Sequence, residues 1–276
     1  MALGCVTGLG VAAYSQEIEP QELSVERRKI FLPRILPELD GFTVALLSDF
    51  HYGAYVDHLL KSAVQVINDA EPDIVLLAGD FVTRHDNNLD HLTRDAHACG
   101  QILSGLRARC GVMAVLGNHD HSGPPEIVVE SLAYSGIPVL RNSAVAVQRN
   151  NSRLWIGGID DVLQGKPDLA RTFKGVPPSD PNILLAHEPD YADHVSRTHP
   201  VDLQLSGHSH GGQVRFPFLG APVLPRMAEN YPMGWYRVGD VQLYTSRGLG
   251  MVGPRVRFNC PPELTFLTLH SSKVRS

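Results

Sequence analysis

Short runs of apolar, often β-branched residues recur along the chain, and five of them are followed closely by a polar cluster. Runs of this length and composition predict buried strands. They cover residues 44–47, 74–78, 112–116, 183–186 and 201–205. The clusters that follow are Asp49-Phe50-His51, Gly79-Asp80, Gly117-Asn118-His119-Asp120, His187 and Gly207-His208-Ser209-His210. Because strand ends feed the loops in which α/β folds collect functional side chains, the five clusters predict one common site.

Apolar residues at helical spacing predict three helices in the first half of the chain. These helices cover residues 56–70, 89–106 and 124–134, and a strand over residues 25–32 precedes them. The alternation predicts at least three parallel strands. Further short strands predict a second, more antiparallel sheet, over residues 139–140, 144–147, 154–159, 183–186, 203–205, 213–216, 241–245 and 264–269. We therefore expect an α/β protein in which two sheets pack face to face, with helices outside them and one shared cleft.

The composition of the 276 residues, 43% hydrophobic and 19% charged, is that of a soluble globular protein. No linker-like segment divides the chain, so we expect one catalytic domain over residues 25–276. The net charge of −5 argues against nucleic-acid binding, because phosphate backbones require a basic surface. The four cysteines lack metal-finger spacing, although Cys99 and Cys110 could pair in an exported protein.

Positive charge is concentrated toward the C-terminus, where residues 201–276 hold eight Lys/Arg against four Asp/Glu. One interpretation is ordinary variation of the surface. The other is that some of these arginines face an anionic substrate or lipid. The candidates are Arg215, Arg226, Arg237, Arg247, Arg255 and Arg257.

The first sixteen residues carry no charge and are rich in Gly, Ala, Val and Leu. They are too short for a membrane span, which needs about 20 residues, and they lack the basic start of a signal peptide. Two interpretations are open: a remnant of an export or anchor segment, or a short apolar helix lying on the protein or on a membrane. We favour the remnant and assign residues 1–24 to it.

The clusters contain donors for two metal ions. Asp49 and His51 are two residues apart, so on a regular strand they would point to the same side and hold one ion. Asp80 can bridge two cations that would otherwise repel each other. Asn118 and His187 offer an amide oxygen and an imidazole nitrogen to a second ion.

His208 and His210 complete the candidate ligand set and are again two residues apart. A mixed nitrogen and oxygen set without thiolate suits Mn, Fe, Zn, Co or Ni. Two such ions about 3.5–4 Å apart can share a hydroxide and direct it at phosphorus. The sequence therefore predicts metal-dependent cleavage of a phosphate ester.

His119 directly follows a candidate ligand, so we expect its side chain to face the cleft. With Asp120 beside it, an imidazolium at this position could stabilise the transition state or protonate the leaving group. The competing interpretation is a loop histidine satisfied by backbone groups. Arg84, Arg215 and Arg247 are candidates for gripping the substrate phosphate.

These clusters, in this order, resemble the signature of the calcineurin-like metallophosphoesterase superfamily: D-x-H, G-D, G-N-H-D/E, H and G-H-x-H. The resemblance implies a four-layer α/β/β/α sandwich of two mixed sheets with flanking helices. It implies that His119 is the catalytic acid or charge stabiliser, oriented by Asp120. It also implies two ligand sets that share one carboxylate: Asp49, His51, Asp80 and His210 for one metal, and Asp80, Asn118, His187 and His208 for the other.

Residues 207–215, 246–250 and 257–263 are similar to segments of a bacterial, membrane-associated branch of that superfamily. Members of the branch carry an export or anchor segment, which implies membrane association or export; without an anchor the protein would be cytoplasmic. Some relatives cleave the lipid precursor UDP-diacylglucosamine. Residues 216–225 are apolar and proline-stiffened, and would be exposed as a lipid-contacting lip or buried as core. We favour core or a mixed role.

The leading hypothesis is a dinuclear metal-dependent phosphodiesterase or pyrophosphatase. Its substrate would be a phosphorylated small molecule or a lipid-linked phosphate, and the protein would contact a membrane peripherally at most. One alternative is a phosphomonoesterase or phosphoprotein phosphatase, because the clusters do not select the substrate. A further alternative is a UDP-diacylglucosamine-type pyrophosphatase, and the last is a membrane-associated scaffold without activity.

Overall fold

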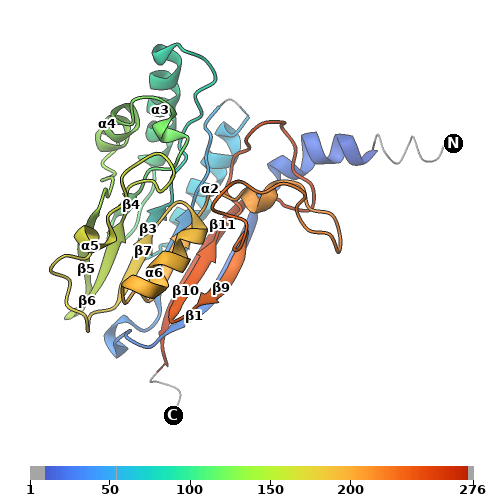
Figure 1. Ribbon diagram of the computed structural model, residues 1–276. Coiled ribbons are helices and arrows are strands. Elements are labelled where there is room, and N and C mark those ends of the chain that lie inside the picture. The colour runs from blue at the N-terminus through green and yellow to red at the C-terminus, as the bar shows by residue number, and fades with distance from the viewer. Residues whose placement is uncertain (1–9, 54, 273–276) are drawn as a thin grey trace.

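The computed structural model describes residues 10–53 and 55–272 (Figure 1). Its first sheet has the strand order β1-β11-β2-β3-β4. All neighbours in it run parallel except β11 and β2, which are antiparallel. The bounds are β1 Ser24–Leu32, β2 Phe42–Leu47, β3 Ile74–Leu77, β4 Val112–Ala114 and β11 Glu263–Ser271.

The second sheet has the order β5-β6-β7-β8-β10-β9. Its three central pairings are parallel and its two edge pairings are antiparallel. The first sheet has one antiparallel pairing of four, so the second sheet is the more antiparallel of the two, as expected, although its centre is parallel. Strands β7 and β8 are buried throughout, as parallel strands covered on both faces must be. The bounds are β5 Ser143–Arg149, β6 Ser152–Gly158, β7 Asn182–Leu185, β8 Leu203–Ser206, β9 Gly234–Val238 and β10 Val241–Thr245.

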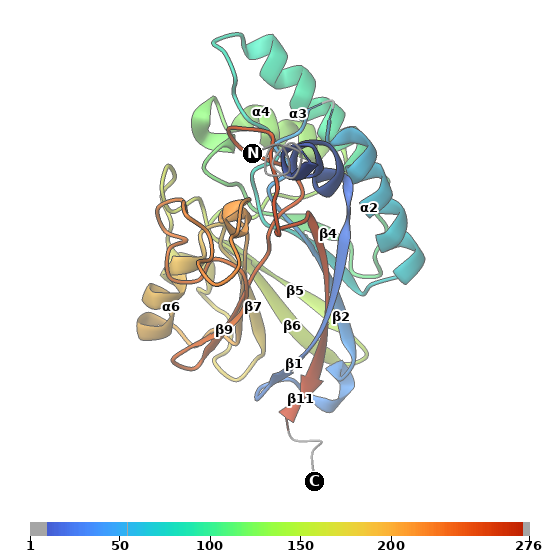
Figure 2. The ribbon, with the colours of Figure 1, turned by 90° about the vertical axis from the view of Figure 1, so that its right-hand side faces the viewer.

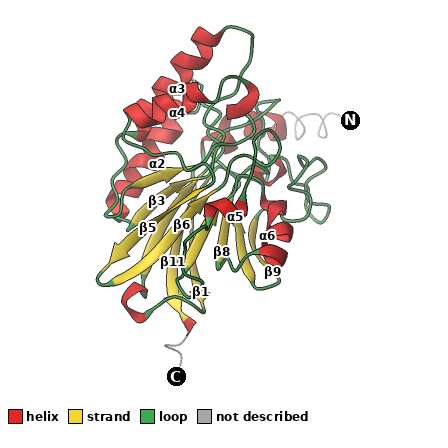
Figure 3. Cartoon of the chain, turned by 60° about the vertical axis from the view of Figure 1, so that its left-hand side comes forward, coloured by secondary structure: helices red, strands yellow, loops and turns green. Residues whose placement is uncertain are grey.

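Helices cover the outer face of each sheet (Figure 3). The first sheet is covered by α2 Asp57–Ala70, α3 Leu89–Leu103 and α4 Glu126–Tyr134, and the second by α5 Leu169–Thr172 and α6 Ala192–Thr198. Helix α3 begins where the Asn88 side chain accepts a hydrogen bond from the Asp90 N–H. Short 3-10 or π turns lie at η1 Tyr14–Ile18, η2 Glu19–Gln21, η3 Pro37–Leu39, η4 Asp120–Ser122, η5 Pro189–Tyr191 and η6 His210–Gly212.

Three apolar layers separate the four layers of secondary structure. Alternate residues of β2 point to opposite faces, so Ala45 and Leu47 pack against the helices, whereas Val44 and Leu46 pack against the second sheet. A third layer joins the second sheet to α5 and α6 through residues such as Val195. The predicted α/β/β/α sandwich of two mixed sheets is therefore confirmed.

Several predicted strands have a different place in the structure. Residues 264–269 belong to the first sheet as part of β11, between β1 and β2, and not to the second. Residues 139–140 contribute only a bridge from Val139 to Ala114 of the first sheet. Residues 213–216 form two isolated bridges instead of a strand. Strand β9 was not predicted, because it is an edge strand whose alternating exposure leaves no continuous apolar run.

The N-terminal segment packs on the catalytic domain. Residues 10–13 are helical and continue into η1. The buried carboxylate of Glu19 accepts hydrogen bonds from the N–H groups of Asn259 and Cys260, and Ser15 O accepts one from Arg257 N. Within the described part of the chain, no helix has the length and apolar character to cross a bilayer. Residues 1–9, which carry part of the predicted anchor remnant, lie outside the described residues.

Candidate metal centre and active site

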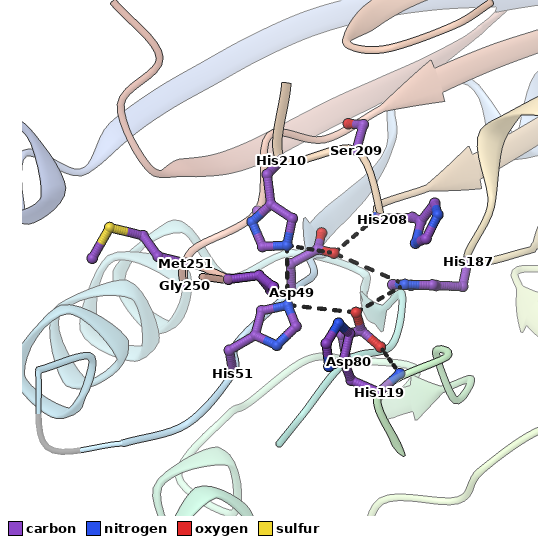
Figure 4. Close-up of polar contacts among 12 residues, drawn as sticks. Asp49, His51, Asp80, His119, His187, His208, Ser209, His210, Gly250 and Met251 are labelled. Carbon is purple, nitrogen blue, oxygen red and sulfur yellow. Dashed lines mark hydrogen bonds and ion pairs between the residues drawn. The ribbon is translucent and has the colours of Figure 1, made fainter. Parts of the chain in front are cut away.

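The loops that follow β2, β3, β4, β7 and β8 converge at one end of the two sheets and bring the predicted ligands together (Figure 4). Two carboxylates lie among the histidines. Asp80 Oδ2 is 3.4 Å from His51 Nε2 and 3.2 Å from His187 Nε2. Asp49 Oδ1 is 3.6 Å from His210 Nε2 and 4.0 Å from His187 Nε2. The side chains thus surround a common centre.

Three groups of described side chains in this centre have the geometry to hold a cation. The donor atoms of Asp49, His51 and His210 lie within 4.8 Å of one another, and so do those of Asp80, His187 and His208. A third group, His51, Asp80 and His119, shares one member with each of the other two. The short distance from Asp80 to His51 places this carboxylate between the first two groups.

The donors fit cations better than they fit one another. The Nε2 atoms of His51 and His210 face each other at 3.0 Å, although two neutral imidazoles can share only one proton there. Buried polar atoms without a hydrogen-bond partner are rare in native proteins. Within the described residues this centre holds four of them: Asp49 Oδ2, Asn118 Oδ1, His187 Nε2 and His210 Nδ1. The donor set of nitrogen and oxygen atoms is that of borderline divalent metals.

Burial keeps three of the imidazoles neutral, as metal ligation requires. It lowers the pKa of His51 to about 3, that of His208 to about 4 and that of His210 well below its ordinary value. Burial also opposes charge on His187, but the carboxylates of Asp80 and Asp49 outweigh it and raise the pKa of this histidine. Neutral nitrogen donors therefore lie beside a pair of carboxylates.

Hydrogen bonds on the outer side of each ring aim the opposite nitrogen at the centre. His187 Nδ1 donates to Ala78 O at 2.6 Å, and His208 Nε2 donates to Arg226 O at 2.9 Å. His51 Nδ1 pairs with Thr83 Oγ1 at 2.6 Å. The two carbonyl acceptors require an N–H on the outer side of His187 and His208. The Thr83 hydroxyl can donate or accept, so it orients the His51 ring without fixing its tautomer.

The ligands do not point inward through regular strand alternation, as we expected for Asp49 and His51. Both lie beyond the end of β2 at φ values of 53° and 41°, and Asp80 has a φ of 58°. Non-glycine residues rarely adopt this left-handed conformation, and its clustering here marks backbone strain at a functional site. His208 and His210 share it, with φ values of 69° and 51°.

Asp120 supports the loops that carry these ligands. Its buried carboxylate accepts hydrogen bonds from backbone N–H groups of Asp80, Phe81, Val82 and Gly117, at 2.8 to 3.3 Å. It therefore ties the loop after β3 to the loop after β4. Asp120 was predicted to orient the His119 ring, but none of these four hydrogen bonds comes from that ring.

His119 lies at the edge of the centre, half-buried, and lines the adjoining cavity. Its ring meets that of His51 edge to face, with 4.8 Å between the ring centroids. Its backbone N–H donates to Asp80 Oδ1 at 2.8 Å. The side chain is thus placed beside the ligands, where it can reach a bound substrate.

The three arginines proposed for substrate binding are engaged with the protein. Arg84 donates to Asp86 O and Ser122 O, and Arg215 donates to Gly211 O at 2.8 Å. Arg247 is largely buried, with Nε 2.8 Å from Glu263 and Nη2 3.1 Å from Glu26. None of these three arginines is among the described residues that line the cavity beside the metal centre.

Arg257 is a residue of the site that no motif assigned. Its fully buried guanidinium donates to the carbonyl oxygens of Cys260, Arg247, Gly248 and Gly250. The same loop holds Asp49 in place, because the Gly250 N–H donates to Asp49 O at 2.6 Å. The sequence offered two signals: the family similarity of residues 257–263, and the place of Arg257 among the arginines that could face an anionic substrate or lipid. The second expectation is wrong for Arg257, because its buried guanidinium binds the protein's own carbonyl groups.

A cavity of about 560 Å³ adjoins the metal centre. Its floor includes Asp80, Asn118 and His119, and its walls are apolar. Residues 216–225 contribute to these walls and extend beyond them, and Phe218 is fully exposed at their tip. None of residues 216–225 is buried, so the expectation of core is wrong for the whole segment, which is exposed or partly exposed as expected of a lip. The described cysteines are free, including Cys99 and Cys110.

Comparison with known proteins agrees with this geometry. Residues 42–212 match the calcineurin-like phosphoesterase family. The chain belongs to this family. The resemblance predicted from the sequence is confirmed. The prediction that the protein is a metal-dependent phosphoric ester hydrolase is also confirmed.

Three relatives align over most of their length. The "uncharacterized metallophosphoesterase YkuE" of Bacillus subtilis is 34% identical over 99% of this chain and 94% of its own. The "phosphodiesterase YaeI" of Escherichia coli is 34% identical over 83% and 82%. The "UDP-2,3-diacylglucosamine pyrophosphatase LpxG" of Chlamydia trachomatis is 28% identical over 92% and 91%. These relatives are bacterial, as predicted for the branch.

Proposed function

We propose that this protein hydrolyses a phosphodiester or pyrophosphate bond with two metal ions, which would be held by two ligand groups that share Asp80. The observation that carries the proposal is the place of the Asp80 carboxylate, 3.4 Å from His51 on one side and 3.2 Å from His187 on the other. Asp49 and His210 complete one ligand set. Asn118 and His208 complete the other, with Mn, Fe or Zn as the best-suited ions and Co or Ni as alternatives.

The protein side chains have separate tasks in this reaction. When bound, the two ions supply an activated water and neutralise charge on the phosphoryl oxygens. His119 lies beside this position on the cavity floor and gives a proton to the leaving oxygen or stabilises its charge. Asp120 and Arg257 hold the ligand-bearing loops through backbone hydrogen bonds.

The charge of the cavity supports a diester or pyrophosphate over a phosphomonoester. Among the described residues that line it there is no Arg or Lys. Arg84, Arg215 and Arg247 already donate to protein groups. A cavity without such a cation favours the less charged phosphorus: a diester carries one negative charge, as does each phosphorus of a disubstituted pyrophosphate, whereas a terminal phosphate carries close to two near pH 7. The names of two relatives, a phosphodiesterase and a lipid-precursor pyrophosphatase, support the same choice.

The test compares turnover of bis-p-nitrophenyl phosphate and p-nitrophenyl phosphate by protein loaded with Mn²⁺, Fe²⁺ or Zn²⁺. We expect the protein to turn over the diester faster than the monoester. We expect elemental analysis to find two bound metal ions per chain. Asp80→Asn should lose both activity and metal. Asp202→Asn is the matched control, because Asp202 is an equally buried carboxylate at the opposite end of β8. Normal turnover by Asp80→Asn, or preference for the monoester, would contradict the proposal.

A further inference from the structure

An exposed apolar surface borders the cavity beside the metal centre. It consists of Phe216, Phe218, Leu219 and Val223, which we call the apolar rim; their exposed fractions are 46%, 107%, 85% and 74%. Soluble proteins rarely leave neighbouring large apolar side chains this exposed without a partner.

The apolar rim is held in a defined shape. Phe216 and Gly220 exchange two backbone hydrogen bonds of 2.9 Å, which close a tight turn. Phe218 lies at the tip of this turn with a φ of 67°. A bulky residue in the left-handed conformation is unfavourable, so the turn presents Phe218 to the outside at a conformational cost.

The apolar rim continues into the cavity that holds the reacting groups. Phe216 and Val223 belong to both, and the cavity lining also includes Val252 and Val256. The floor is formed by polar residues of the metal centre, among them His208. This arrangement suits a ligand with a phosphoester at one end and a hydrocarbon body that extends along the wall to the outside.

The N-terminal segment adds a second apolar element at the same end of the molecule. Figures 1 and 2 show its helix close to the loop of residues 250–258. Val11 and Ile18 of this segment are about half exposed, at 49% and 50%. Residues 1–9, which lead into it, contain no charged side chain.

Hydrogen bonds join this segment to the cavity wall. Arg257 N donates to Ser15 O at 2.9 Å, and Asn259 N donates to Glu19 Oε2 at 2.9 Å. Residues 250–258 supply both this attachment and the wall residues Val252 and Val256. The two apolar elements are therefore held in one surface.

Basic side chains accompany this surface. Residues 213–226 contain Arg215 and Arg226, and residues 250–258 contain Arg255 and Arg257, with no Asp or Glu in either segment. Arg226 and Arg255 are exposed, whereas Arg257 is buried in its loop. Glu17 is the one acidic side chain of residues 10–18 that is exposed. Exposed apolar side chains accompanied by two exposed arginines are complementary to the surface of an anionic bilayer.

We propose that the apolar rim and residues 10–18 dock on an anionic lipid bilayer, and that the cavity takes a phosphoester lipid whose hydrocarbon chain lies along its apolar wall. The cleavage of that lipid rests on the proposed function, whereas the docking does not. In this arrangement the lipid headgroup reaches the metal ligands without leaving the bilayer surface completely.

The experiment measures sedimentation of the full chain with vesicles of phosphatidylcholine alone, or of phosphatidylcholine and phosphatidylglycerol in equal parts. The test variant is Phe218→Asn with Leu219→Asn, because asparagine tolerates the left-handed conformation at position 218. The control is Tyr134→Asn, since Tyr134 is 85% exposed at the end of α4, outside this surface.

We expect binding to the anionic vesicles, and a loss of about tenfold for each apolar side chain removed from the apolar rim. The control should bind as the unmodified chain does. Hydrolysis of soluble bis-p-nitrophenyl phosphate should stay unchanged in both variants. If the unmodified, metal-loaded protein bound vesicles but did not hydrolyse bis-p-nitrophenyl phosphate, the proposed function would be contradicted and the docking proposal would stand.

Equal vesicle binding by the test variant and the unmodified chain would overturn the docking proposal, as would absence of binding to anionic vesicles at low salt. Light scattering provides a further check. If the unmodified chain forms a dimer that the test variant abolishes, and the dimer does not bind vesicles, a second copy of the chain covers the apolar rim and the proposal is wrong.

Discussion

Gly207 leaves no space for a side chain beside the ligand Asp49, so Gly207→Ala is a sharp test of the metal centre. A Cβ at this position would lie 2.6 Å from Ser48 Cβ, and closer still to Asp49 Oδ2. Ser48 and Asp49 are both fully buried. The Asp49 carboxylate is also held from the other side, because the His208 N–H donates to Oδ1 at 2.8 Å.

The size of the effect follows from these distances. Ordinary contact begins at 3.4 Å, so the new methyl group and Ser48 Cβ have to separate by 3.4 − 2.6 = 0.8 Å, and Asp49 Oδ2 has to move further. Overpacking of this kind costs about 1–3 kcal/mol of stability. A displacement of about 1 Å among groups that position a reaction lowers the rate about 100-fold.

The assay measures kcat/KM for bis-p-nitrophenyl phosphate, bound metal and the free energy of unfolding. The control is Gly53→Ala, because a Cβ on Gly53 would meet Tyr55 at an ordinary 3.5 Å. We expect Gly207→Ala to lose about 100-fold in kcat/KM and to bind less metal, while the control stays near the unmodified protein. If Gly207→Ala kept both metals and full activity, our description of the Asp49 environment would be refuted.

Three further predictions concern other parts of the site. His119→Asn should lower kcat about 100-fold and leave two metals bound, as measured by steady-state kinetics and elemental analysis; loss of metal would make His119 a ligand instead. Arg257→Met should destabilise the protein by at least about 3 kcal/mol in urea, because it removes the donor to the carbonyl oxygens of Cys260, Arg247 and Gly250, whereas Gly248 O keeps the Glu263 N–H. An unchanged urea midpoint would contradict this. Removal of metal by a chelator should lower the melting temperature, and added Mn²⁺ should restore it, because ions that bind only the folded state stabilise it. A melting temperature that does not respond to either addition would show that the centre binds no metal.

Local pattern predicted the strands that carry the ligands. The run at residues 74–78 became β3, residues 74–77, because four consecutive apolar residues are stable only where both faces are covered. The same reasoning did not place residues 264–269, since the pattern of a strand is the same in either sheet. These residues belong to β11, whose pairing with β1 and β2 joins segments more than 200 residues apart. Which strands pair over such a separation depends on the packing of the whole chain.

Within the site, the identity of the ligands was predicted and their geometry was not. Asp49 and His51 converge through left-handed backbone in a loop, a conformation that the surrounding contacts impose and residue spacing does not encode. Asp120 was expected to orient His119 but binds backbone N–H groups of two loops. Arg257 had no motif, because its hydrogen bonds go to main-chain carbonyls that any sequence supplies.

By itself, the sequence determined the chemistry of this protein: the types of its metal donors, their order along the chain, and the strand ends that carry them. Residue type and local periodicity are properties of the chain, so they can be read before it folds. Only the tertiary structure decided that Asp80 lies between two ligand groups and that Phe218 is exposed beside an apolar-walled cavity. Both depend on which distant segments exclude water from one another, and that is determined by the packing of the complete fold.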